Sequence, residues 1–278
     1  MRLLRPLPPD RSFEQIRNHY LVERSIAKRL KGSSREKRTL IYTTMYQELF
    51  SKVPDHPRLT RRKSERLTKI KNKDKFNLVR RFLTGSDVFA EFGPGDSIFA
   101  AKVAGKVKYV YGIDITDQRN ISDIFPENFE LIIYDGYNLN EIESNSIDII
   151  FSDQLIEHLH PEDTKLHFKL VHRLLKTGGK YVFRTPHSLT GPRDISRYFS
   201  EKPECLHMKE WTYNEIRKML LDTNFSTFYF YWRAKGMNLR LPYSYFAVCE
   251  KILGLFPKRY IRKAAKRLLN AIYISAVK

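Results

Sequence analysis

A short glycine-containing turn carries the strongest chemical signal in the sequence. Glu91-Phe92-Gly93-Pro94-Gly95 closes an apolar run over residues 87–92 and precedes a helix-like segment over residues 97–103. Glycines at such a turn let backbone N–H groups approach a ligand, and the N-terminus of the following helix favours a negative group such as a carboxylate. Because ligands of open α/β sheets bind at the carboxyl ends of the strands, this turn predicts a ligand site.

Acidic residues end the next two apolar runs. Asp114 follows residues 108–113, about 20 residues beyond the glycines, where it is placed to accept hydrogen bonds from both hydroxyls of a ribose. Asp135 and Gly136 follow residues 129–134. A glycine pair alone is weak evidence, whereas a glycine turn and two acidic strand ends in this order are much more specific.

Apolar runs that alternate with helical patterns indicate the architecture that positions these residues. Strands are predicted at residues 87–92, 108–113, 129–134, 147–151, 180–185, 226–232 and 271–277, with helices at residues 97–103, 162–175 and 212–223. This alternation predicts an α/β fold, with a seven-stranded, mostly parallel sheet covered by helices on both faces.

Two segments are predicted as additions to this sheet. Residues 1–85 form a basic helical N-terminal extension, and residues 86–278 form the main domain. Residues 235–270 form a helical insertion before the last strand. Its final helix, 257–270, has an apolar stripe and a basic face, which would suit either packing against the domain or contact with anionic lipid.

Composition and charge exclude several classes of protein. A chain of 278 residues with 42% hydrophobic residues can bury a real core, and no stretch approaches the roughly 20 apolar residues that span a bilayer. Two cysteines and no apolar leader favour the reducing cytoplasm. The net charge of +19 divides into +15 over residues 1–85, −5 over residues 86–200 and +9 over residues 201–278. This asymmetry favours an anionic partner or surface, although well-solvated basic helices would also explain it.

The order of the glycine turn and the acidic strand ends resembles that of the class I S-adenosylmethionine-dependent methyltransferases, which have a Rossmann-like fold. The resemblance covers residues 86–232 and the last strand, and it implies S-adenosylmethionine as cofactor. An NAD-dependent dehydrogenase would usually show three glycines. Ser97 stands where many methyltransferases have a third glycine, which implies a slightly looser contact. The cofactor-binding residues that the resemblance implies are Glu91, Gly93 and Gly95 at the methionine end, Asp114 at the ribose, Asp135 and Gly136 at the adenine, and Ser152, Asp153 and Gln154 beside the methyl group.

Glu157 and His158 follow the fourth strand. They resemble a pair that helps to bind a divalent metal in ubiquinone-pathway and small-RNA methyltransferases. Here Gln154 replaces the earlier carboxylate of that set, although His187 follows the fifth strand. An oxygen and nitrogen set with one carboxylate suits Mg²⁺, Mn²⁺ or Zn²⁺ poorly, so we expect no metal and a positioning role for the pair. The Pro-Pro-aromatic sequence of enzymes that methylate base amines is absent from this strand end.

His187 is the predicted general base. Neutral imidazole accepts a proton near pH 7, and the residue lies just past the fifth strand, although a histidine that only bonds loop backbone would fit the sequence equally well. Residues 185–211 are predicted to shape the acceptor pocket, where Arg193, Arg197 and Lys209 would bind a phosphate or carboxylate. A surface loop packed by its own aromatic residues is the alternative.

The predicted acceptor is a small molecule or a glycan or lipid-linked precursor, anionic and methylated on oxygen. RNA bound by the basic extension is a second hypothesis, but no stacking platform interleaves the basic residues. A membrane-surface or scaffold protein that uses residues 257–270 is a third, and peripheral contact with the inner face of the membrane is compatible with catalysis.

Overall fold

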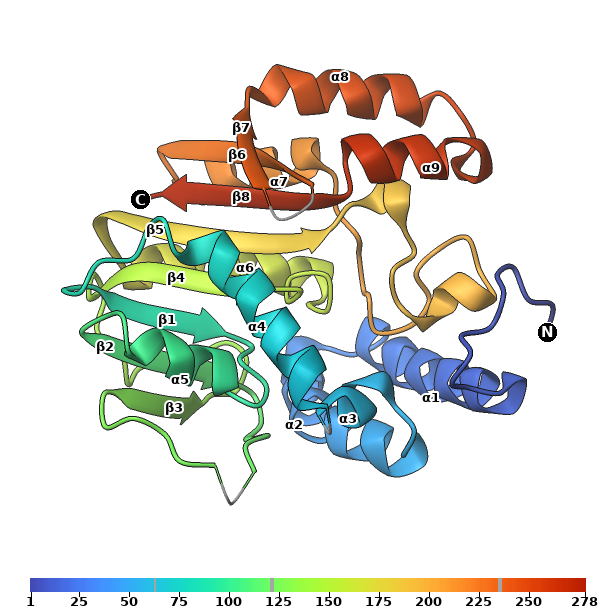
Figure 1. Cartoon of the computed structure of the whole chain (residues 1–278), viewed down its shortest axis with the longest axis horizontal. Coiled ribbons are helices and arrows are strands. Elements are labelled where there is room, and N and C mark those ends of the chain that lie inside the picture. The colour runs from blue at the N-terminus through green and yellow to red at the C-terminus, as the bar shows by residue number, and fades with distance from the viewer. Residues whose placement is uncertain (63, 121–122, 235–236) are drawn as a thin grey trace.

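The computed structural model describes residues 1–62, 64–120, 123–234 and 237–278. Within them an eight-stranded sheet has the order β3-β2-β1-β4-β5-β8-β6-β7 (Figure 1). The α/β fold class predicted from the sequence is confirmed. The strands are β1 (Val88–Phe92), β2 (Tyr109–Asp114), β3 (Phe129–Ile133), β4 (Ile147–Asp153), β5 (Leu175–Pro186), β6 (Thr227–Ala234), β7 (Met237–Leu241) and β8 (Ala271–Val277).

The sheet is parallel from β3 to β5 and antiparallel beyond. β8 pairs antiparallel with both β5 and β6, so the last strand in the sequence lies between two earlier ones. The predicted count of seven strands was wrong because β7 forms an antiparallel hairpin with β6 at the edge of the sheet. An exposed edge strand lacks the buried alternation that marks a strand in sequence. The expected helical insertion therefore begins with a strand, and its residues 235–236 lie outside the described residues.

Helices cover both faces of the sheet, and one of them belongs to the N-terminal extension. α4 (Glu65–Val79) and α5 (Ile98–Ala104) pack on one face through Leu78, Val79 and Phe99. The other face is covered by α6 (Pro161–Leu174), α7 (Tyr213–Asp222), α8 (Tyr243–Gly254) and α9 (Lys258–Leu268).

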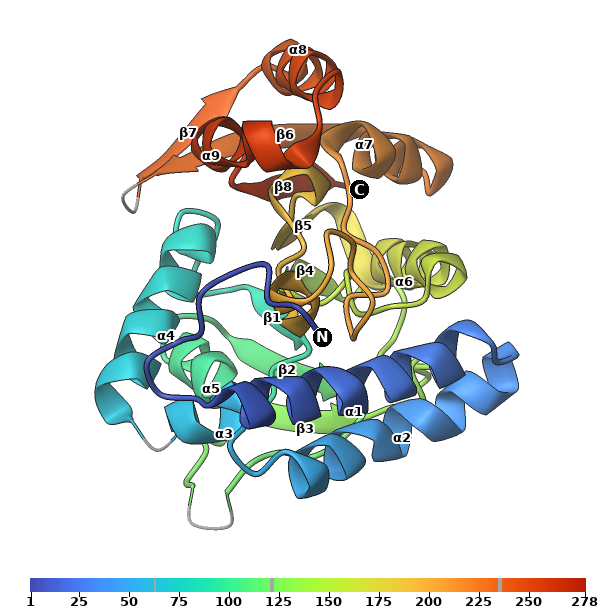
Figure 2. The same ribbon diagram turned by 90° about the vertical axis from the view of Figure 1, so that its right-hand side faces the viewer.

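The first two helices cover the carboxyl ends of the strands. α1 (Phe13–Lys31) and α2 (Arg35–Lys52) lie side by side in front of the sheet in Figure 2, and α3 (Pro57–Arg62) follows them. A capping box at Ser12 begins α1, since Ser12 Oγ accepts the Gln15 N–H while the Gln15 side chain accepts the Ser12 N–H. Apolar residues of α1 and α2 pack with Leu206 and Met208, which lie between β5 and α7. Two short 3₁₀ turns, η1 (Ser188–Thr190) and η2 (Ile195–Tyr198), lie in that same connection.

None of the helices in the described residues combines the length and apolar character needed to cross a bilayer.

Candidate active site

A cavity of about 350 Å³ lies at the carboxyl ends of β1, β2 and β4. We call it the first cavity. Its volume falls in the range of about 300–1,000 Å³ that is typical of small-molecule sites. The glycine turn lines it, as do Asp114, Gly136 and the end of β4. The predicted ligand site and the cavity therefore coincide.

The glycine turn is shaped by backbone conformations that favour glycine. Gly93 and Gly95 have φ values of +69° and +65°. A Cβ on Gly93 would also meet Leu155 Cδ1 at 3.2 Å, so a larger residue would be both strained and crowded. Ser97 adopts the same left-handed region at φ 59°, and its buried Oγ has no hydrogen-bond partner among the described residues. The turn at the first cavity thus has left-handed backbone at three positions. Glycine, which adopts this conformation freely, occupies two of them, and Ser97 occupies the third.

Asp114 has the geometry of a ribose acceptor. Its carboxylate accepts the Gly95 N–H at 3.0 Å and the Ile115 N–H at 2.8 Å, which orients it at the end of β2. Burial raises its pKa from the ordinary value, although the backbone donors oppose this effect. A carboxylate has about four lone-pair sites, so these bonds leave capacity for two hydroxyl groups.

The other cofactor-binding residues predicted from the sequence divide into two groups. Gly136, Asp153 and Gln154 line the first cavity. Glu91, Asp135 and Ser152 are not among the described residues that line it, because other groups of the protein engage their side chains. Glu91 pairs with Lys75, Asp135 accepts the N–H groups of Tyr137 and Asn138, and Ser152 Oγ lies 2.7 Å from Tyr181 Oη.

The charged end of the first cavity is built partly by α4. Lys75 Nζ lies 2.7 Å from the fully buried Glu91, and Lys71 lines the same wall. Within the part of the chain that the structure describes, Glu91 Oε2 has no hydrogen-bond partner. Burial alone would raise the pKa of Asp153, but the Arg184 guanidinium lowers it to about 2, so its carboxylate is ionised. Two ammonium groups and an ionised carboxylate suit the carboxylate and amino groups of a methionine moiety. Together with Asp114, this set of groups fits S-adenosylmethionine.

The N-terminal extension contributes to this cavity, which no sequence pattern predicted. Tyr42, Met45, Tyr46 and Arg58 line it. A buried ion pair holds this wall in place, since Arg38 of α2 donates to both oxygens of Asp163 on α6, at 2.8 and 2.7 Å. No local pattern marks such a pair, because its two residues are 125 positions apart.

A second cavity of about 390 Å³ adjoins the first. The two share the residues Tyr46, His56, Pro57, Arg58 and His158. The far wall comes from the connection between β5 and α7, and Arg193, Arg197 and His207 lie on it. The connection thus lines a pocket, as was predicted from the sequence. It gives the second cavity several basic side chains.

His158 stands at the junction of the two cavities with a defined tautomer. Its Nδ1 lies 3.0 Å from the carbonyl oxygen of Leu206, so Nδ1 carries the proton and Nε2 carries the lone pair. Burial lowers the pKa of His158 to about 3, which keeps the ring neutral. A neutral imidazole with a fixed lone pair can accept a hydrogen bond from a ligand.

Glu157 and His207 form a buried acid–base pair behind His158. A carboxylate oxygen of Glu157 and one ring nitrogen each of His158 and His207 lie within 4.8 Å of one another. Burial raises the pKa of Glu157 to about 7. Thr185 donates to its Oε2, while no described residue forms a hydrogen bond with its Oε1. Burial would lower the pKa of His207, but the hydrogen bond to Glu210 and the charge of Glu157 raise it to about 9. His207 was not predicted from the sequence, and it adds positive charge to the second cavity.

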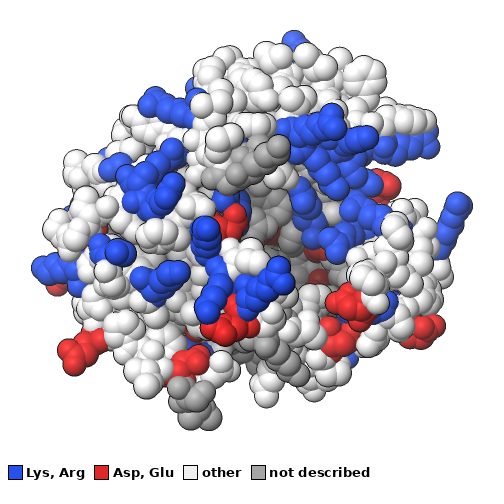
Figure 3. All heavy atoms as spheres, in the orientation of Figure 1, with Lys and Arg blue, Asp and Glu red and all other residues white. Residues whose placement is uncertain are grey.

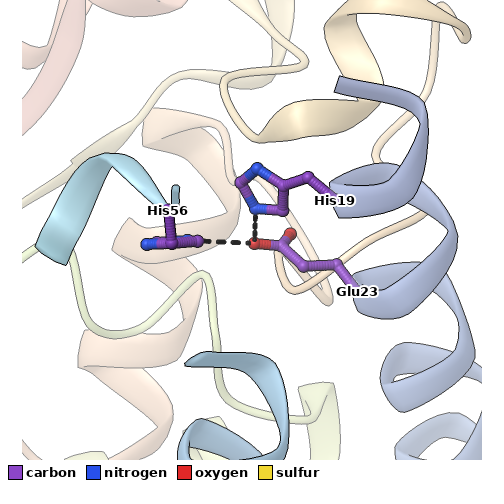
Figure 4. Close-up of side chains that lie close together, drawn as sticks. All are labelled: His19, Glu23 and His56. Carbon is purple, nitrogen blue, oxygen red and sulfur yellow. Dashed lines mark hydrogen bonds and ion pairs between the residues drawn. The ribbon is translucent and has the colours of Figure 1, made fainter. Parts of the chain in front are cut away.

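A further cluster of His19, Glu23 and His56 lines the second cavity (Figure 4). His19 Nδ1 accepts from Arg11, so its Nε2 carries the proton that faces Glu23 at 2.7 Å. His56 Nδ1 accepts the Arg58 N–H, so its Nε2 also presents a proton to Glu23, at 3.6 Å. Metal ligation needs lone pairs on these nitrogens, and this tautomer pattern offers none. The cluster instead fixes the turn that carries Arg58.

The remaining predicted residues lie apart from the junction. His187 is fully buried, its Nε2 lies 2.7 Å from Glu250, and its Nδ1 accepts the Leu189 N–H. Both ring nitrogens are therefore occupied, and His187 is not among the described residues lining either cavity, so we assign it no part in proton transfer. Lys209 pairs with Glu215 and also lies outside both linings, whereas Arg193 and Arg197 line the second cavity.

Comparisons with known proteins agree with this site. A family model described as a methyltransferase domain matches residues 90–183, which hold the glycine turn, Asp114 and the end of β4. No curated protein sequence matches the chain significantly.

Several solved structures share the fold. An S-adenosylmethionine-dependent methyltransferase from Archaeoglobus fulgidus is 17% identical, with a TM-score of 0.52 over 76% of this chain and 94% of that one. A second S-adenosylmethionine-dependent methyltransferase, from Mesorhizobium loti, is 16% identical, with a TM-score of 0.50 over 74% of this chain and 98% of that one. Phosphoethanolamine N-methyltransferase 1 of Haemonchus contortus, solved with phosphoethanolamine and S-adenosylhomocysteine, is 14% identical, with a TM-score of 0.53 over 88% of this chain and 50% of that one. At these identities the likeness concerns the fold.

The family match covers the strands and turns that build the first cavity, and the groups lining that cavity fit the cofactor of this family. The chain therefore contains a methyltransferase domain, with a first cavity that fits S-adenosylmethionine.

Proposed function

We propose that the enzyme methylates an oxygen atom of a small anionic acceptor, free or linked to a glycan or lipid, that binds in the second cavity. The observation that carries this proposal is the shared wall of the two cavities, where His158 lines both. Methyl transfer is an in-line displacement, so the acceptor atom must approach from the side opposite the leaving sulfur. An adjoining cavity that opens onto the cofactor site meets this requirement.

S-adenosylmethionine supplies an activated methyl group on a sulfonium. The protein must orient the acceptor and remove its proton. His158 Nε2 presents a lone pair at the junction, so it accepts the hydrogen bond of an acceptor hydroxyl and aims the oxygen toward the first cavity. Methylation of the hydroxyl oxygen would make its proton strongly acidic, so that even the weakly basic Nε2 of His158 would take the proton up. The low pKa of His158 then favours release of that proton to water.

The charge of the second cavity supports an anionic acceptor and oxygen as the target atom. Arg58, Arg193, Arg197 and protonated His207 line this cavity. The lining also contains Asp10, Glu23 and Asp194, but with Arg11 the basic groups outnumber the acidic ones, which favours a phosphate or carboxylate over a protonated amine. A similar fold binds a small phosphate-bearing molecule in the Haemonchus structure, although that enzyme is named for methylating nitrogen.

The test is a methyl-transfer screen with radiolabelled S-adenosylmethionine against fractionated cell extract. We expect label in a small anionic product with the wild-type enzyme. The His158→Ala variant should lose about 10²- to 10⁴-fold in turnover with unchanged S-adenosylhomocysteine affinity.

His187→Gln is the matched control, because His187 lies outside both linings, and it should retain turnover once folding is verified. Full turnover by the His158→Ala variant would refute the role of His158. Label found only in RNA or protein would refute the acceptor class.

A further inference from the structure

Basic side chains from three distant segments converge beside the outer wall of the second cavity. In Figure 3 Lys and Arg side chains gather over the region of α9 and the hollow below it. The side chains concerned influence one another electrostatically. We call them the cationic cluster: Arg5, Arg193, Arg197, Lys258, Arg262 and Lys266.

The fold holds this cluster together by specific contacts. The Leu4 N–H donates to the Tyr198 carbonyl at 2.8 Å, which docks the N-terminal arm, including Arg5, against η2. Arg193 Nη2 donates to Asn270 Oδ1 at 2.8 Å, at the end of α9. The three basic residues of α9 in the cluster lie on one face of the helix, because residues 258, 262 and 266 are four positions apart.

The positive charge of the cluster is poorly compensated. Arg262 pairs with Glu201, but no hydrogen bond or ion pair joins Arg5 or Lys266 to any described residue. Arg5 Nη2 and Arg262 Nε are buried without a hydrogen-bond partner among the described residues. Burial and the neighbouring guanidinium groups lower the pKa of Arg5, and burial and the same neighbours lower that of Lys266. Buried donors without acceptors are costly, and an anion would relieve both this cost and the repulsion.

We propose that the cationic cluster binds a phosphate or diphosphate ester carried by the acceptor. This inference rests on the proposed function and adds to it the chemical class of the group that anchors the substrate. Arg193 and Arg197 belong to both the cluster and the second cavity, so one molecule can span them. Its phosphate lies against Arg5 and Arg262 while its hydroxyl reaches His158.

Titration of the full-length enzyme with inorganic pyrophosphate, followed by calorimetry, tests the cluster directly. The double variant Arg262→Gln with Lys266→Gln should weaken binding by at least about tenfold, because charge-assisted hydrogen bonds are lost. The double variant Arg259→Gln with Lys263→Gln is the matched control. It removes the same charge from the neighbouring stripe of α9, and it should change the affinity by less than about twofold.

A second arm identifies the source of the phosphate. Phosphatidylglycerol vesicles, compared with phosphatidylcholine vesicles, should bind in a cluster-dependent manner only if the ester is a lipid headgroup. Cluster-dependent binding in either arm supports the inference. No binding in either arm, or equal losses in both double variants, overturns it. The radiolabel screen, run in parallel, distinguishes this failure from failure of the proposed function, which would appear as full turnover by the His158→Ala variant or as label found only in RNA or protein.

Discussion

The two cavities are built in different ways although they share a wall. The first takes its essential groups from the ends of adjacent parallel strands, where β1, β2 and β4 bring the glycine turn, Asp114 and Asp153 together. The second is assembled from residues 8–23, 46–58 and 193–207, which meet only when the whole chain folds. The comparison shows that the cofactor side depends first on local order along the sheet, with the N-terminal extension closing one wall, whereas most of the acceptor side is assembled only when the N-terminal helices are docked.

The largest expected effect concerns that docking. Arg38→Ala removes the cation from the buried Asp163 and leaves it only the hydroxyl groups of Tyr42 and Tyr137, so the free energy of unfolding should fall by about 3–5 kcal/mol. Urea denaturation measures this change. Lys37→Ala, one residue away on the exposed face of α2, is the control and should cost no more than about 0.5 kcal/mol. Equal losses in the two variants would mean that the extension is not held by this ion pair.

The second largest effect should be a pH dependence of stability that comes from His207 in the second cavity. The folded-state pKa of His207 is raised to about 9, so its contribution to stability is complete below pH 6.5 and is lost as the pH rises through 9. The loss should approach about 3 kcal/mol. Unfolding free energies measured between these two pH values should therefore decline, and His207→Gln should flatten the decline. If the unfolding free energy of the His207→Gln variant declined with pH as steeply as that of the wild type, His207 would not be the group that titrates.

On the cofactor side, the largest effect should come from Asp114. Asp114→Ala removes a carboxylate acceptor, and the dissociation constant of S-adenosylhomocysteine should rise about a hundredfold. Calorimetry provides the measurement. Asp117→Ala removes the same charge from a more exposed position three residues along, and it should leave the affinity unchanged. An intact affinity in the Asp114 variant would place the ribose elsewhere.

The smallest expected effect sharpens the description of the glycine turn. Ser97→Gly removes a left-handed serine and its unpartnered hydroxyl, and it should stabilise the fold by about 1 kcal/mol with little change in cofactor affinity. Ser97→Ala removes only the hydroxyl and should stabilise less. A destabilised glycine variant would show that the serine side chain supports the turn.

The sequence was sufficient to predict those strands and site residues that are marked by a pattern in neighbouring residues. Residues 87–92 and 108–113 were recognisable as strands because buried parallel strands are continuous apolar runs, and the polar residues that end them were placed by fold rules. Glu91 was placed correctly on its strand, but its partner Lys75 was not foreseen. His207 and the Arg38–Asp163 pair have no periodic or spacing signal. His187 was preferred over His158 because its contact with the carboxylate of Glu250, 63 residues away, cannot be inferred from its sequence neighbours.

The position of β8 has a consequence for how the protein is made. On a ribosome β5 is synthesised roughly 90 residues before β8, at about 5–20 residues per second, so its pairing edge stays open for several seconds. β6 also lacks its inner neighbour during that interval, because Thr227–Phe230 pair with β8. Two unpaired strand edges invite association with other chains. Nascent chains stalled before Ala271 should therefore depend on chaperones, and completion of β8 is the step that releases them.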